Sequence, residues 1–137
     1  MKKILTLGLL LMTGMVYGQY RSIDIKTQTR SSSTMVWNDN IQNFDFYDNK
    51  DKEEFYVNWH FVLNSVQNKG TIVCNNITYD VKEIKPVVGE DKSNMLIIEA
   101  ATTRSQTKVT VIVSVSEAGS ILVAVYEFQA RKAYYFN

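Results

Sequence analysis

The sequence contains very few of the residues that covalent cross-links and metal sites require. Its 137 residues include one cysteine, Cys74, and one histidine, His60. A single cysteine excludes a disulfide within the chain, and one cysteine with one histidine cannot supply the four nitrogen and sulfur ligands of a structural zinc site. The stability of the domain must therefore come from packing.

The sequence also lacks the motifs of common catalytic, phosphate-binding and nucleic-acid-binding sites. The sequence has no Gly-rich phosphate loop, no Gly-x-Ser-x-Gly nucleophile elbow and no basic stripe with interleaved aromatics. His60 and Cys74 lack partners that the sequence can place beside them, so we interpret the first as a surface or half-buried residue and the second as a small buried hydrophobe. We expect a protein that is not an enzyme and that needs no cofactor or metal.

Charge of either sign is limited. The chain has 15 Lys and Arg against 14 Asp and Glu, and this near-neutral balance offers no electrostatic footprint for nucleic acid or an anionic membrane surface. The acidic segment 48–54 has no glycine for the sharp bend of a calcium loop and carries lysines at would-be ligand positions. We interpret it as a solvated loop, and we expect no nucleic-acid partner.

The N-terminus has the pattern of a bacterial secretory signal. Two lysines precede an apolar stretch, and Gly18 supplies a small residue before the expected cleavage site. The stretch is shorter than the roughly 20 residues of a membrane span, and Cys74 lies too far along the chain for a lipid anchor. We therefore predict a signal peptide over 1–18, a single mature domain over 19–137 without a membrane span, and a periplasmic or extracellular location.

β-Branched residues are abundant and are densest between Lys108 and Gln129. Two such runs meet at 117–119, where a glycine suits the third, left-handed position of a three-residue hairpin loop. This loop fixes the register, which pairs Val115 with Ile121 and gives the hairpin one unbroken aliphatic face. We predict that this face lies in the core.

Alternating apolar and polar residues predict further strands along the chain. They cover Arg21–Arg30, Ile41–Asp48, Thr71–Asp80 and Met95–Thr102. Within the third, Asn75-Asn76 can form the tight turn of a second hairpin that pairs Cys74 with Ile77 and buries the thiol. Pro86 cannot donate a ladder hydrogen bond, so it predicts a strand end or edge.

Residues 51–70 carry two competing patterns. Phe55, Val57 and Trp59 alternate with polar residues as in a strand, whereas Phe55, Trp59 and Val66 also fit helical spacing. The dominance of aromatic and β-branched residues favours the strand. With it, the chain has about eight or nine short strands. They predict an all-β fold, either an antiparallel β-sandwich or a small β-barrel.

The second face of the 108–129 hairpin carries more apolar side chains than a solvent-facing surface needs. Its largest members are Ile112, Leu122, Tyr126 and Phe128. Because contiguous exposed apolar surface usually marks an interface, our leading hypothesis is a non-catalytic binding module that contacts an unknown protein through this face or a sheet edge. Alternatively, the aromatic residues 134–136 or another strand cover the face.

A second hypothesis depends on the barrel. An eight-stranded barrel has enough interior for one small ligand or for side chains alone. The aromatic candidates for lining such an interior are Trp37, Trp59, Phe61 and Tyr79. A cavity above roughly 300 Å³ lined by aromatics would favour a small apolar ligand, and a filled core would exclude it.

Overall fold

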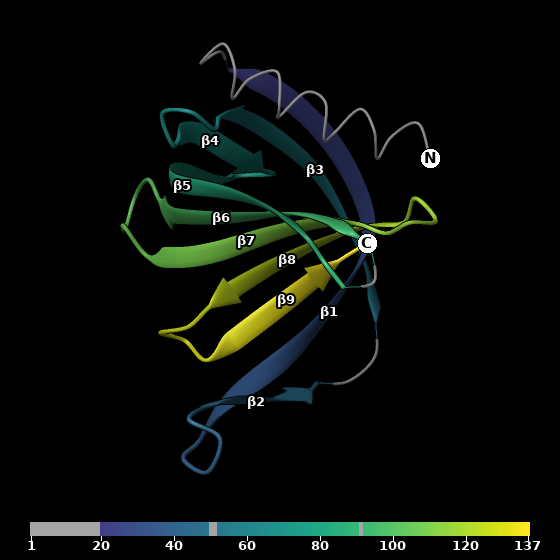
Figure 1. Cartoon of the computed structure of the whole chain (residues 1–137), viewed down its shortest axis with the longest axis vertical. Coiled ribbons are helices and arrows are strands. Elements are labelled where there is room, and N and C mark those ends of the chain that lie inside the picture. The colour runs from purple at the N-terminus through teal and green to yellow at the C-terminus, as the bar shows by residue number, and fades with distance from the viewer. Residues whose placement is uncertain (1–19, 50–51, 91) are drawn as a thin grey trace.

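The computed structural model describes residues 20–49, 52–90 and 92–137, which form nine β-strands (Figure 1). The predicted signal peptide over 1–18 lies outside the described residues. The strands are β1 (Arg21–Asn38), β2 (Asn43–Asp48), β3 (Glu53–Asn64), β4 (Lys69–Cys74), β5 (Ile77–Val88), β6 (Asn94–Thr102), β7 (Lys108–Val115), β8 (Ile121–Glu127) and β9 (Lys132–Phe136).

Eight of these strands form a closed antiparallel barrel. Their order is β1-β3-β4-β5-β6-β7-β8-β9, and β9 pairs with β1 to complete the circle. The register at the closure aligns Arg30 with Phe136, and the backbone carbonyl of Asn137 accepts a hydrogen bond of 2.9 Å from the amide of Thr29. The predicted all-β fold is confirmed, and the barrel is the one of the two expected architectures that forms.

Inward side chains alternate along the strands, and aliphatic residues fill part of the barrel interior. The register Val115 to Ile121 forms as predicted, and Gly119 in the loop has a φ of 94°. The predicted aliphatic face of this hairpin is therefore core. The valines that it buries are Val109, Val111, Val113, Val115, Val123 and Val125.

Residues 53–64 form a strand, so the helical alternative for this part of the chain is wrong. Trp59 and Phe61 point inward and are buried, with their rings stacked at a centroid distance of 6.1 Å. The indole nitrogen of Trp59 donates a hydrogen bond of 3.0 Å to the hydroxyl of Thr27. This bond satisfies the one polar atom of a large buried side chain and fixes the orientation of its ring.

The second predicted hairpin also forms. Cys74 pairs with Ile77, and the thiol is buried with 7% of the residue exposed. Pro86 lies within β5, not at its end. Because β4 pairs with β5 only as far as Val81, the strand is an edge at Pro86, which is a position where the missing amide is tolerated.

β1 is longer than the predicted strand 21–30 and continues to Asn38. It remains extended because β9 pairs with residues 30–34 and β2 pairs with residues 33–38. A register shift between Thr27 and Thr29 interrupts its ladder with β3. Such a bulge exchanges the two faces of a strand.

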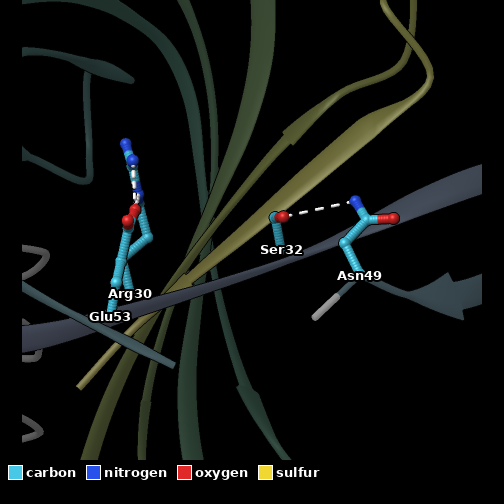
Figure 2. A network of polar contacts seen from close by, with 4 residues as sticks. All are labelled: Arg30, Ser32, Asn49 and Glu53. Atoms are coloured by element: carbon cyan, nitrogen blue, oxygen red, sulfur yellow. Dashed lines mark hydrogen bonds and ion pairs between the residues drawn. The ribbon is translucent and has the colours of Figure 1, made fainter. Parts of the chain in front are cut away.

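Beyond the barrel, β1 and β2 continue as a hairpin (Figure 1). Its register places Met35 beside Phe46 and Trp37 beside Phe44. Where β2 ends, the side-chain amide of Asn49 donates a hydrogen bond of 3.2 Å to the hydroxyl of Ser32 (Figure 2). This contact attaches the connection between β2 and β3 to β1.

Candidate functional site

The barrel contains a cavity of about 400 Å³. Asn75, Asn76 and Ile77 form part of its rim and are exposed, so the cavity is accessible from solvent. Its volume exceeds the lower limit of roughly 300 Å³ for small-ligand pockets. The lining residues are Arg30, Phe55, Val57, Trp59, Cys74, Asn75, Asn76, Ile77, Tyr79, Val125, Glu127, Tyr134 and Phe136.

Aromatic rings from β3 and β9 form one wall of the cavity. Phe136 lies edge-on to Trp59 at a centroid distance of 5.1 Å and is 6.2 Å from Phe55. Both Trp59 and Phe136 are buried, whereas Phe55 is partly exposed. Edge-to-face contacts of this kind are favourable and directional, so they give the wall a defined shape before any ligand enters.

Arg30 lies against this wall, and its charge is already paired. Its guanidinium carbon is 3.9 Å from the centre of the Phe55 ring. Its Nε donates a hydrogen bond of 2.8 Å to a carboxylate oxygen of Glu53, and its Nη2 donates to the same oxygen (Figure 2). The bulge in β1 explains the position of Arg30, because an even-numbered residue of β1 would otherwise face outward.

The thiol of Cys74 and the phenol of Tyr79 lie next to each other in the cavity. Burial raises the pKa of Cys74 from 9.0 to about 11, although a hydrogen bond with Tyr79 opposes the shift. Burial also raises the pKa of Tyr79, with smaller contributions from Cys74 and Glu127. Both groups are neutral at physiological pH, so Cys74 lacks the thiolate that a nucleophile needs.

The two predicted sets of site residues lie in different places. From the ligand set, Trp59 and Tyr79 line the cavity. Phe61 is buried beside Trp59 without reaching the lining. Trp37 lies in the hairpin outside the barrel, where it is 45% exposed and contacts Phe44 edge-on at 5.1 Å.

From the interface set, Ile112, Leu122 and Tyr126 lie on the outer face of β7 and β8, where Ile112 and Leu122 are partly exposed, and Phe128 lies in the turn after β8. Tyr126 contacts Phe46 of β2 at 6.1 Å, and Phe128 contacts Phe44 of β2 at 6.0 Å. Burial raises the pKa of Tyr126, helped by its neighbour Tyr135. Another strand therefore covers part of this face, as one of the sequence alternatives expected. Phe128 remains 43% exposed.

Sequence reasoning did not identify Arg30, Phe55 and Phe136 as lining residues. Arg30 depends on the bulge in β1, and Phe136 depends on the closure of the barrel by β9. Neither feature leaves a local signal in the sequence. Glu127 does have a local signal in the sequence, because it ends the aliphatic face of β8. Its side chain lines the cavity.

Comparisons with protein-family models, curated proteins and solved structures found no match. Among residues 20–49, 52–90 and 92–137, no group of three or more His, Cys, Asp and Glu side chains could hold a metal ion. The same part of the chain contains no helix with the length and hydropathy needed to cross a membrane.

Proposed function

We propose that this chain is an exported carrier that binds a small, largely apolar molecule in the cavity of its barrel. The observation that carries the proposal is a solvent-accessible space of about 400 Å³ with an aromatic wall. Ligand sites are typically concave, mostly apolar and supplied with a few polar groups. The cavity has this composition, with Trp59 and Phe136 as apolar surface and Tyr79 and Glu127 as polar groups.

The driving force is the removal of apolar ligand surface from water. Each buried methylene contributes about 0.8 kcal/mol, so an eight-carbon chain gains roughly 6 kcal/mol before the entropy of association is subtracted. Simple alkyl ligands should therefore bind with dissociation constants of roughly millimolar or weaker. Tighter binding requires additional polar contacts within the cavity.

The chemistry of the lining supports binding over catalysis. The raised pKa of Cys74 leaves its thiol protonated, and Arg30 is held by Glu53. His60, the best catalytic candidate in the sequence, is exposed and pairs with Asp24, and it does not line the cavity. The outer-face interface has less support, because Phe44 and Phe46 already contact Phe128 and Tyr126.

A blocking variant tests the proposal. Ile77→Trp places a large ring at the rim of the cavity, where Ile77 is 48% exposed and a larger side chain can be accommodated. The matched control is Val88→Trp, because Val88 is 70% exposed and is not a lining residue. The readout is the fluorescence of the neutral apolar dye N-phenyl-1-naphthylamine during titration with each protein.

We expect saturable dye binding to the wild type and to Val88→Trp with dissociation constants within about twofold of each other, and binding at least about tenfold weaker to Ile77→Trp. Equal loss of binding in both variants would indicate that the dye binds outside the cavity. No saturable binding of this dye to the wild type would count against a carrier of apolar molecules.

A further inference from the structure

Glu127 is a cavity residue whose charge is not paired by the protein. It lies at the end of β8 and is partly exposed. Within the described residues, its carboxylate makes no hydrogen bond and no ion pair with another side chain. Its charge acts on the cavity, because it contributes to the raised pKa of the neighbouring Tyr79. A carboxylate in partly apolar surroundings gains from a cationic partner.

The basic residues around Glu127 are engaged elsewhere. Lys132 lies opposite Glu127 in the ladder of β8 and β9, but its ammonium group is 3.2 Å from the hydroxyl of Thr34 on β1. β1 flanks the other side of β9, so Lys132 extends away from Glu127. Arg131 places its guanidinium 4.6 Å from the centre of the Phe44 ring, and Arg30 is paired with Glu53.

The aromatic wall of the cavity also favours a positively charged ligand. Ring faces attract cations, and the protein already uses this attraction at Arg30, which stacks 3.9 Å from Phe55 and lies 6.0 Å from Tyr134. Trp59 and Phe136 line the same space. Tyr79 is held neutral by its raised pKa, so it offers a hydroxyl and a ring without a competing charge.

We infer that the ligand of this cavity is an organic amine, with an apolar body against the aromatic wall and an ammonium group paired with Glu127. The inference rests on the proposed carrier function and adds the charge of the ligand to it. An anionic ligand would have to displace Glu53 from Arg30 and accept the unpaired carboxylate of Glu127 as a neighbour. A neutral ligand would leave Glu127 without a partner.

Three ligands with the same eight-carbon body test the inference: octylammonium, 1-octanol and octanoate. The protein contains two tryptophans, so a ¹⁵N-labelled sample gives two indole N–H signals in a two-dimensional NMR spectrum. Of these two residues, only Trp59 lines the cavity. Dissociation constants are obtained from the shift of its signal for the wild type, for Glu127→Gln, and for the control Glu117→Gln, which removes an exposed carboxylate in the loop between β7 and β8.

We expect octylammonium to bind the wild type about tenfold more tightly than 1-octanol, because a charge-assisted contact adds to the same apolar burial. Octanoate should bind most weakly. In Glu127→Gln the affinity for octylammonium should fall, so that its difference from the affinity for 1-octanol is within about twofold. Glu117→Gln should behave as the wild type.

Equal affinity of the wild type for octylammonium and 1-octanol, or a preference that persists in Glu127→Gln, overturns the inference and leaves the carrier function in place. Tightest binding of octanoate also overturns it and identifies Arg30 as the partner of the ligand. If none of the three ligands shifts the Trp59 signal, both the inference and the proposed carrier function fail.

Discussion

At the scale of single residues, burial makes two groups in the cavity harder to ionise. Cys74 and Tyr79 share a hydrogen bond, and loss of solvent raises the pKa of both. The guanidinium of Arg30 is paired with the carboxylate of Glu53. From the sequence, we interpreted Cys74 as a small buried hydrophobe, and its thiol is buried. The thiol is also one of the polar groups that line the cavity, whose boundaries the sequence did not predict.

The raised pKa of Cys74 predicts a loss of stability in alkali. The thiol ionises near pH 9.0 when unfolded and near 11 when folded. As the pH rises through this interval, the unfolded chain releases the proton first, so the free energy of unfolding falls. Urea denaturation at several pH values should show a steeper fall between pH 9 and 11 for the wild type than for Cys74→Ala. If the free energy of unfolding changed with pH in the same way for both proteins, the result would contradict the raised pKa of Cys74.

Gly70 occupies a position that no other residue can take without strain. Its φ is 151°, and a Cβ atom there would lie 2.1 Å from the backbone oxygen of Val62. Gly70→Ala should therefore lower the free energy of unfolding by about 2 kcal/mol or more, because β3 and β4 must separate to admit the methyl group. Chemical denaturation measures the loss. Gly89→Ala, at a glycine without a positive φ, should change the stability by less than about 1 kcal/mol, and an equal loss in both would argue against the clash.

At the scale of elements, β1 connects two separately packed regions. Before its bulge, Ile25 and Thr27 are buried in the barrel; after it, Ser33 and Met35 are buried on the opposite face. There the hydroxyl of Ser33 lies 2.8 Å from that of Tyr135. The exchange of faces allows one strand to close the barrel and to carry the hairpin that packs on its outer surface.

The packing of this hairpin is open to a direct test. Phe44 contacts the rings of Trp37 and Phe128 and the guanidinium of Arg131. Phe44→Ala should lower the free energy of unfolding by about 1 to 3 kcal/mol, below the usual range for a fully buried phenylalanine because Phe44 is partly exposed. The control Tyr47→Ala removes a ring that is 57% exposed on the same strand and should cost less than about 0.5 kcal/mol.

Dye binding distinguishes the hairpin from the cavity. The dissociation constant of Phe44→Ala for N-phenyl-1-naphthylamine should match that of the wild type, because Phe44 is not a lining residue. An unchanged stability of Phe44→Ala would mean that the outer contacts contribute nothing, and the outer face of β8 would then remain available to a partner.

At the scale of the whole molecule, turn residues in the sequence predicted the hairpins, whereas pairing between strands far apart in the sequence determines which residues line the cavity. Gly119 and the pair Cys74 with Ile77 belong to turns whose registers follow from neighbouring residues. The pairing of Arg30 with Phe136 joins the first and last strands of the barrel. The alternation of apolar and polar residues within a strand cannot predict which distant strand will be its neighbour. The sequence thus left sandwich and barrel open, and with them the existence of a cavity.

The same distinction applies to the residues proposed to line the cavity. Trp59 and Tyr79 lie at the cavity because the alternation of their own strands turns their side chains inward. Trp37 follows the same alternation in β1, but the bulge moves its ring to the outer face. The bulge between Thr27 and Thr29 contains no glycine that would mark it in the sequence.

The central claim, that an apolar molecule occupies the cavity beside Trp59, can be tested by contact quenching with a brominated alcohol. Bromine on 8-bromo-1-octanol quenches indole fluorescence only at close range. Trp37→Phe leaves Trp59 as the only tryptophan, and Trp59→Phe leaves Trp37, which is 45% exposed outside the cavity. We predict saturable quenching in Trp37→Phe and only weak, linear quenching in Trp59→Phe, with circular dichroism confirming that both are folded. Equal quenching of the two tryptophans, or saturable quenching of Trp37 alone, would contradict the account.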